Sequence, residues 1–320
     1  MKGFIQIKME KYYLAVDLGG TSAKCAVIHQ EQIIKRFTVP TKIGEVIENI
    51  HQTVTKEIVD LQITTADFQF IGFTICGLID YEKGISLWSG NLQWENYEVV
   101  KEIKRIFQNP HVFILNDSKA ATYGEYVGGI NQEKPNVLFY TIGTGIGGGV
   151  ILNHQLYFGN HTKLASEPGH GGGFQNLYQC NCGLQGCVEG LSSATGIEKQ
   201  INKNRDYFCK KLNLDKSKLT IKDIAPLFYA KDKVTMDLFK IALAPLANHI
   251  AVSLHLLDFD IVIIGGGPCA LGDDLLVLLK ELLKQSLLPA FYEKLDLRIA
   301  KLENDAGIWG IYHFAKNLLK

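Results

Sequence analysis

The sequence of 320 residues has little arginine and no excess of either charge. It contains only four arginines, and its 33 basic side chains are balanced by 33 acidic ones. Proteins that bind nucleic acid or anionic membranes gather basic residues on one surface. The neutral balance therefore argues against a nucleic-acid partner and against a membrane-surface partner.

Long hydrophobic runs are also lacking. The most apolar windows are interrupted by His249 and His255 or by Lys280 and Glu281, so no run of about 18 uncharged apolar residues predicts a membrane span. Closely spaced charges near the N-terminus leave no apolar core for a signal peptide. We therefore expect a cytoplasmic protein, in which the seven cysteines stay reduced.

Glycine, in contrast, is abundant, and the 31 glycines gather at the ends of predicted strands. Strands are predicted over 12–19, 23–28 and 32–39, with connections too short for helical crossovers, which makes them antiparallel. A second block begins in a similar way after a polar linker over 131–136, with strands over 137–142 and 147–152. Further strands are predicted over 68–75 and 295–302, and helical periodicity predicts helices over 99–107, 116–127, 221–229 and 306–318. The pattern predicts a mixed α/β protein.

Two glycine-rich turns are candidate phosphate loops. Asp17-Leu-Gly-Gly-Thr21 lies between two predicted strands, with Lys24 close behind. Glycines let backbone N–H groups approach an anion, and a carboxylate such as Asp17 suits Mg²⁺. A tight hairpin turn explains this segment equally well. Gly143-Thr-Gly-Ile-Gly-Gly-Gly149 fits the dinucleotide fingerprint, but a strand instead of a helix follows it, which favours a phosphate-contacting hairpin loop over a Rossmann fold.

A third glycine cluster, formed by Gly265, Gly266 and Gly267, directly follows a predicted strand over 261–264. Three glycines at this place allow close approach of a flat ligand such as adenine. Glycine is common in loops of this kind, so the cluster alone is a weak signal.

Asn116 and Asp117 stand where a hydrophobic strand over 112–115 gives way to a predicted helix. Asn and Asp are frequent helix N-caps, which is the simpler interpretation. Alternatively, a carboxylate at the carboxyl end of a strand accepts a proton from a bound hydroxyl group.

Three cysteines crowd into eight residues as Cys180-x-Cys182-x₄-Cys187. Three thiolates can converge on one Zn²⁺, which takes four ligands in a structural site. His170 lies ten residues upstream and completes a Cys₃His set. Because all four positions come from the protein, we expect the zinc to be structural.

Together these segments resemble the ROK family of sugar kinases. The order and spacing match from about Tyr12 to the C-terminus, and the most specific motifs are Glu167-Pro-Gly-His170 and Cys180-Asn-Cys-Gly-Leu-Gln-Gly-Cys-Val-Glu189. The resemblance implies an α/β, actin/hexokinase-like (ribonuclease H-like) duplicated fold of two domains with a cleft between them. The domains would be 1–131 plus 304–320, and 132–303.

The resemblance also implies ATP-dependent phosphorylation of a hexose, with glucose as the leading substrate and Asp117 as the general base. N-acetylmannosamine, fructose and β-glucosides are alternative substrates, and a homodimer is common. The implied sugar contacts are Gly77, Asn91, Asn116, Asp117, Glu167, His170 and Glu189. The implied ATP and Mg²⁺ contacts are Asp17, Gly19, Gly20, Thr21, Lys24, Gly143, Thr144, Gly145, Gly265, Gly266 and Gly267.

Two other functions compete with this one. The family includes repressors with a helix-turn-helix before the kinase-like part, but only about eleven residues precede the first predicted strand here. A sugar-binding protein without catalysis is the other alternative, although Asp117 and all three glycine loops are present. The departures from the family pattern at Ser89-Gly-Asn91 and at Gly171-Gly-Gly173 bear on the choice of sugar. A charged segment over 203–217 is predicted to be a small insertion.

Overall fold

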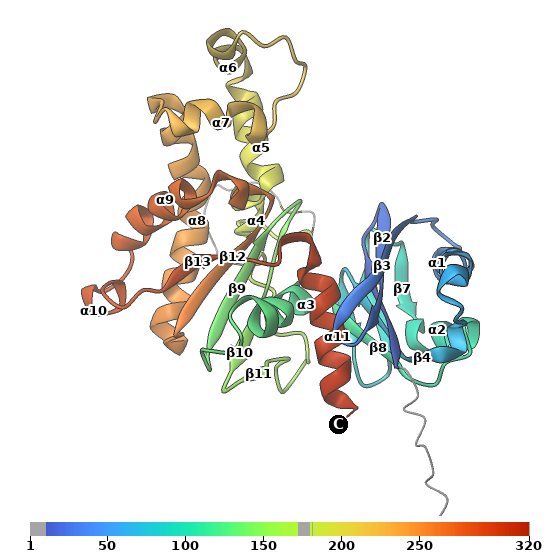
Figure 1. Ribbon diagram of the computed structural model, residues 1–320. Helices are drawn as coiled ribbons and strands as arrows, with labels where there is room; N and C mark the ends of the chain where they lie inside the picture. The colour runs from blue at the N-terminus through green and yellow to red at the C-terminus, as the bar shows by residue number, and fades with distance from the viewer. Residues whose placement is uncertain (1–10, 172–179, 181, 320) are drawn as a thin grey trace, which may run out of the picture. The chain divides into compact units, whose positions relative to one another are not determined.

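The computed structural model describes residues 11–171, 180 and 182–319. The chain divides into two compact units (Figure 1). Of the described residues, the first unit contains those up to Gly128 together with 159–164 and those from Asn304 onward, and the second contains those within 129–158 and 165–303. Each unit is built on a five-stranded sheet.

The sheet of the first unit has the order β3-β2-β1-β4-β8. Strands β1 (Tyr12–Leu18), β2 (Ser22–His29) and β3 (Gln32–Pro40) form the antiparallel meander that their short connections predict. Strands β4 (Phe68–Ile75) and β8 (Val112–Asn116) run parallel to β1. Their carboxyl ends therefore meet at one edge of the sheet.

Helices cover both faces of this first sheet (Figure 1). Helices α1 (Val46–Glu57) and α2 (Val99–Phe107) bury their apolar faces on one side, while α3 (Asp117–Gly124) and α11 (Ala306–Leu318) lie on the other. The last two helices touch at glycines, since a Cβ on Gly310 would stand only 1.8 Å from the carbonyl oxygen of Ala120. The end of the chain is thus packed tightly against the helix that starts at Asp117.

A small antiparallel sheet between β4 and α2 was not foreseen from the sequence. Its strands are β5 (Leu78–Asp80), β6 (Ile85–Ser89) and β7 (Trp94–Tyr97), and each has five residues or fewer. Strands this short carry too few alternating positions to be recognised by periodicity. Two 3₁₀ turns, η1 (Val59–Leu61) and η2 (Thr65–Asp67), connect α1 to β4.

The second unit repeats the arrangement of the first. Its sheet has the order β11-β10-β9-β12-β13, with β9 (Val137–Ile142), β10 (Ile146–Leu152) and β11 (Gln155–Leu156) antiparallel. Strands β12 (Ile261–Gly266) and β13 (Leu297–Ile299) continue parallel to β9. The two sheets have the same order and the same strand directions, as a duplicated fold requires.

A cluster of helices buries one face of the second sheet (Figure 1). The helices are α4 (Glu189–Ser192), α5 (Ala194–Lys203), α6 (Arg205–Leu212), α7 (Ile221–Tyr229), α8 (Lys233–Leu257), α9 (Asp273–Lys284) and α10 (Pro289–Tyr292). Helix α6 occupies the predicted insertion, and its Phe208 is fully buried in the core. The 203–217 segment is therefore part of the packed unit.

Helix α8 is long and apolar enough to pass for a membrane span, although the sequence analysis expected none. The core helix of a soluble protein passes the same test. In this structure Phe239, Leu243 and Ile250 of α8 are completely buried in the core of the second unit. Packing in this core therefore accounts for the apolar residues on the buried face of α8, while Ile241, Val252 and Leu256 are exposed.

Several predicted boundaries moved. The helix predicted over 116–127 stops at Gly124 and continues as a π-helical turn, η3 (Glu125–Gly129). The strand predicted over 295–302 contains only three residues, because β13 pairs with β12 over that length alone. Two further 3₁₀ turns, η4 (Gly267–Leu271) and η5 (Glu303–Asp305), precede α9 and α11.

Candidate active site

Asp17 lies near the carboxyl end of β1 and is held from the neighbouring strand. The hydroxyl of Thr74, directly opposite on β4, donates a 2.6 Å hydrogen bond to Asp17 Oδ1. Lys24 Nζ lies 3.7 Å from Asp17 Oδ2. The first turn of α11 also approaches, because a Cβ on Gly307 would stand 3.0 Å from Oδ1. The carboxylate is thus oriented at the sheet edge, beside the partial positive charge of a helix N-terminus.

The turn after β1 contains Gly19, Gly20 and Thr21. It is closed by hydrogen bonds from the Gly19 N–H to the Ser22 carbonyl and from the Thr41 hydroxyl to the Gly19 carbonyl. A Cβ on Gly20 would lie 2.8 Å from the Cβ of Asn91. The candidate phosphate turn and one candidate sugar contact are therefore in direct contact.

Asn116, and not Asp117, is the N-cap of α3. The Asn116 side chain accepts a hydrogen bond from the Lys119 N–H at 3.0 Å, and its amide donates to the Gly77 carbonyl at 3.1 Å. Asp117 is the first residue of the helix and accepts from the Ser118 N–H at 2.8 Å. The helix cap that the sequence predicts at this pair is therefore formed by Asn116.

Cys76 also belongs to this site, although it is not part of any of the sequence motifs. Its Sγ lies 3.5 Å from the Ser89 hydroxyl and 3.9 Å from Asn91 Nδ2. Burial raises the pKa of the Cys76 thiol, and the negative charge of Asp117 adds to this effect. The thiol is therefore protonated at neutral pH. In the sequence, only its position between the end of β4 and Gly77, a candidate sugar contact, could have placed Cys76 in the site.

In the second unit, the loop between β9 and β10 is bound to Glu189. One carboxylate oxygen, Oε2, accepts from the Ile146 N–H at 3.0 Å, while Oε1 lies 3.4 Å from the Cys180 thiol. A Cβ on Gly145 would come within 2.1 Å of Oε2. The Gly143 carbonyl accepts from the Ala194 N–H at the start of α5. Thr144 is exposed at the tip of this loop.

The three glycines after β12 differ in what their backbone positions require. Gly266 has a φ of 97°, and a Cβ there would collide with the Ile142 carbonyl at 2.1 Å. Gly265 is buried against Phe139, whereas a Cβ on Gly267 would meet nothing within 4 Å. The chain turns closely over β9 at Gly266 and is open beside Gly267.

The predicted zinc ligands converge. One donor atom from each of His170, Cys180, Cys182 and Cys187 lies within 4.8 Å of the others. Cys182 Sγ and Cys187 Sγ are 3.7 Å apart, and Cys180 Sγ is 3.8 Å from His170 Nδ1. With Zn–S bonds of about 2.3 Å, a tetrahedron places its sulfurs about 3.8 Å apart. The cluster therefore fits a tetrahedral zinc ion in both ligand type and size.

Glu167 lies on the same loop as His170, whose N–H donates to the Glu167 carbonyl at 3.1 Å. Through Glu189, this loop and the metal cluster are joined to the glycine loop after β9. The structure thus gathers two sets of candidate residues. The first unit holds Asp17, the β1 turn, Lys24, Gly77, Asn91, Asn116 and Asp117, and the second unit holds the remainder. Gly172 and Gly173 of the predicted departure lie outside the described residues.

Comparison with known proteins agrees with this arrangement. The model of the ROK family matches residues 13–317. A glucokinase of Halalkalibacterium halodurans is 29% identical over 316 residues, which cover 94% of this chain and 94% of that one. An N-acetylmannosamine kinase of Haemophilus influenzae is 29% identical over 307 residues, which cover 96% of each chain. A ROK family glucokinase from Streptomyces griseus, solved in complex with glucose and AMPPNP, is 25% identical with a TM-score of 0.79, over 96% of this chain and 99% of that one.

Proposed function

The chain belongs to the ROK family and is a sugar kinase, and we propose that it transfers a phosphoryl group from ATP to a hexose hydroxyl, with Asp117 as the general base. The observation that carries the proposal is that Asn116 caps α3 while Asp117 is the first residue of the helix. Because Asn116 caps α3, the carboxylate of Asp117 is placed at the carboxyl end of β8 without serving as the cap. Ligands bind at this edge in parallel α/β sheets.

A sugar hydroxyl is a weak nucleophile until its proton is removed. In the proposed step, the hydroxyl oxygen forms a bond to the terminal phosphorus of ATP, and the bond from that phosphorus to ADP breaks. Asp117 takes the hydroxyl proton as the oxygen attacks. Asn91 and Asn116 provide amide groups that orient the sugar, and the hydrogen bond from Asn116 to the Gly77 carbonyl holds one of them in place.

Each unit carries one glycine loop that is a proposed phosphate contact. Gly20 and Gly145 have no Cβ to keep phosphate oxygens away from the backbone. The N–H groups of Gly19 and Gly143 close their own turns by donating to the Ser22 and Gly145 carbonyls. Asp17 fits a Mg²⁺ ligand, since Thr74 fixes one of its oxygens at the sheet edge. When bound, the metal ion neutralises phosphate charge. Lys24 adds a positive charge on the same strand pair.

Glu167, His170 and Glu189 are the proposed sugar contacts of the second unit. Carboxylates and an imidazole offer the acceptors and donors that vicinal hydroxyls need. His170 would also ligate zinc together with the three cysteines. A metal with four protein ligands has no open position, so its task here is to hold the loop of Glu167 and the start of α4 in place.

The test of the proposed base is the Asp117→Asn variant. Its turnover should fall by roughly 10²- to 10⁴-fold because proton removal is lost, while sugar binding measured by calorimetry stays nearly unchanged. Asp215→Asn, an exposed aspartate on the second unit, serves as the control and should keep full turnover. Near-normal turnover of Asp117→Asn would remove Asp117 from the mechanism.

Glucose is the proposed substrate. N-acetylmannosamine is the second candidate, because the glucokinase and the N-acetylmannosamine kinase named above are equally identical to this chain. An ADP-release assay across glucose, mannose, fructose, N-acetylglucosamine, N-acetylmannosamine and cellobiose ranks them by kcat/KM. A cytoplasmic location and a homodimer remain predictions, and light scattering would measure the second against a chain mass of 35.6 kDa.

A further inference from the structure

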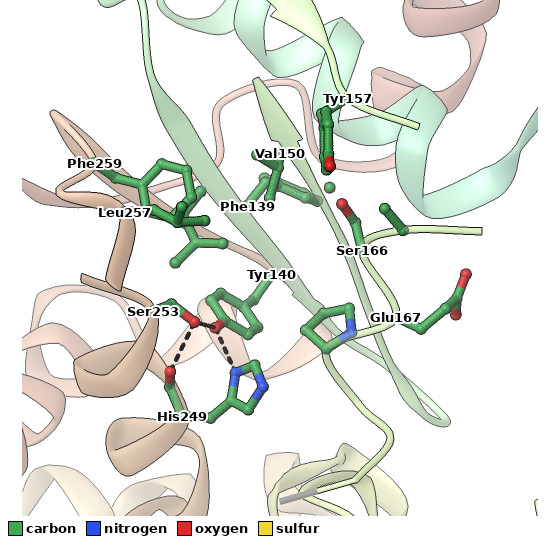
Figure 2. Close-up of a pocket in the computed structure, with 14 residues that line it drawn as sticks. Phe139, Tyr140, Val150, Tyr157, Ser166, Glu167, His249, Ser253, Leu257 and Phe259 are labelled. Carbon is green, nitrogen blue, oxygen red and sulfur yellow. Dashed lines mark hydrogen bonds between the residues drawn. The ribbon is translucent and has the colours of Figure 1, made fainter. Parts of the chain in front are cut away.

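A cavity of about 280 Å³ lies in the second unit, next to the candidate sugar loop. Its walls come from β9, β10, the end of α8 and the segment that leads to Glu167. Most of the lining is apolar, and four aromatic rings contribute to it. Figure 2 shows these rings, from Phe139, Tyr140, Tyr157 and Phe259. The volume is close to the lower end of the range for small-molecule sites.

Ser166, on the rim of this cavity, carries two energetic costs. Its hydroxyl oxygen is buried and has no hydrogen-bond partner. Its φ of 69° lies in the left-handed region, which residues other than glycine rarely adopt. A buried unpaired hydroxyl and a strained backbone are each unfavourable, and such features gather at functional sites. Rotation of the Ser166 side chain toward the cavity would let a ligand with a hydrogen-bonding group remove the first cost.

Apart from Glu167, the other polar groups of the cavity are neutral. Tyr140 Oη is 2.8 Å from His249 Nδ1 and 3.5 Å from the Ser253 hydroxyl, and Figure 2 shows this network. Burial lowers the pKa of His249 and raises that of Tyr140, so both side chains are uncharged at neutral pH. Glu167 also lines the cavity, but Figure 2 shows its carboxylate turned away from Tyr140 and Phe259. An ionised ligand would therefore find no partner of opposite charge here.

We propose that this cavity binds a small uncharged aromatic molecule bearing one hydroxyl group, with the hydroxyl paired to Ser166 and the ring among the aromatic side chains. Aromatic rings favour one another in offset and edge-to-face arrangements, which selects a ring over an alkyl chain. The unpaired Ser166 hydroxyl selects a ligand with a polar group, and the neutral lining selects against carboxylates and amines.

The probe for the binding test is p-cresol, titrated into the full-length protein by calorimetry without sugar or ATP. We expect saturable binding at one site per chain. Toluene, which lacks the hydroxyl, should bind roughly two- to tenfold more weakly because one hydrogen bond is lost. Benzoate should not bind measurably, since its charge would be buried without compensation.

Three variants locate the site, and a fourth is the control. Ser166→Ala should abolish the advantage of p-cresol over toluene while leaving toluene binding intact. Val150→Trp should fill the cavity and abolish binding of both compounds, and Leu257→Trp does the same from the half-exposed end of α8 without altering the sheet. Val252→Trp places the same indole on the exposed side of α8, outside the cavity, and should bind p-cresol normally.

The proposal is wrong if p-cresol does not saturate, or if it binds equally to all four variants, which would indicate only adventitious association. A second result would also contradict the proposal: the native protein does not bind p-cresol, and light scattering shows that Leu257→Trp changes the oligomeric state. In that case a second copy of the chain closes the cavity.

A ligand bound in the cavity should change sugar binding, and this inference rests on the proposed function. Ser166 and Pro168, which flank Glu167 in sequence, both line the cavity. Bound p-cresol should therefore change the Kd for the sugar, and bound sugar should change the Kd for p-cresol by the same factor, both measured by calorimetry without ATP. Val150→Trp should be insensitive. If p-cresol binds as described and no sugar is phosphorylated, the proposed function fails and the cavity site stands.

Discussion

At the scale of single residues, the candidate site depends on pairs of neighbours that divide tasks between them. Asn116 uses its side chain to cap α3 and to hold the Gly77 carbonyl, which leaves Asp117 as the proposed base. Thr74 orients Asp17 in the same way from the adjacent strand. In both pairs a neutral side chain fixes the position of the backbone or of a carboxylate, so that the charged group has one defined orientation.

Gly145 offers a direct test of this residue-scale packing. A methyl group in Gly145→Ala would collide with Glu189, which must then leave the Ile146 N–H. We expect the free energy of unfolding to fall by about 1–3 kcal/mol, as for other overpacked sites, and the KM for ATP to rise.

The matched control for this test is Gly143→Ala, two residues earlier in the same loop. The nearest atom to its added methyl group is 4.0 Å away, so its stability should change by less than about 0.5 kcal/mol. Denaturant unfolding compares the two variants directly. Equal stability of the two would contradict the contact between Gly145 and Glu189.

At the scale of elements, the site is made from the ends of strands and the beginnings of helices. The register of the parallel strands places Asp17 level with Thr74, and Ile75 level with Asn116. Helices α3 and α4 begin at Asp117 and Glu189. The short β5–β7 sheet adds a third element, since it carries Ser89 and leads into Asn91.

The metal cluster belongs to this scale because it ties a loop to the start of a helix. Purified protein should hold about one zinc per chain, measured by native mass spectrometry. Cys182→Ser should lose both the metal and thermal stability, since binding of a structural zinc contributes to folding. Acidification should release the zinc, because protons compete for the cysteine thiolates.

Cys209→Ser is the control for the metal, since Cys209 lies on α6 and outside the cluster. It should retain zinc and the Tm of the native protein. Metal-free protein with full activity and an unchanged Tm would overturn the structural role of the cluster.

At the scale of the whole molecule, one strand arrangement occurs twice. Each unit has a hairpin on one side of its first strand and two parallel strands on the other. Each also has its own hydrophobic core, around α1 and α2 in the first unit and around α8 in the second. A core in each unit gives both sets of candidate residues a separate rigid support.

Ligand binding should stabilise the molecule as a whole. A sugar substrate at a hundred times its Kd adds about 2.7 kcal/mol to the free energy of unfolding, which corresponds to an increase in Tm of several degrees. The measurement is a thermal scan with the sugar that has the highest kcat/KM. The enantiomer of that sugar has the same composition and should leave the Tm unchanged. Equal shifts for both enantiomers would show a solvent effect and no site.

The sequence by itself determined the features that depend on local order along the chain. Strands β4 and β9 and helices α2, α7 and α11 have the predicted bounds, because apolar periodicity and turn residues act over a few positions. The Cys₃His set could also be predicted, since three of its members lie within eight residues. The family resemblance rested on motifs of the same short-range kind.

Tertiary structure alone decided which residues meet across long separations. Asp17 meets Thr74, Gly145 meets Glu189, and Gly310 meets Ala120, and none of these contacts follows from spacing along the chain. The role of Cys76 and the cavity beside Ser166 became visible only in three dimensions, for the same reason. Burial and hydrogen-bond satisfaction are properties of a packed neighbourhood, and strands distant in sequence create that neighbourhood.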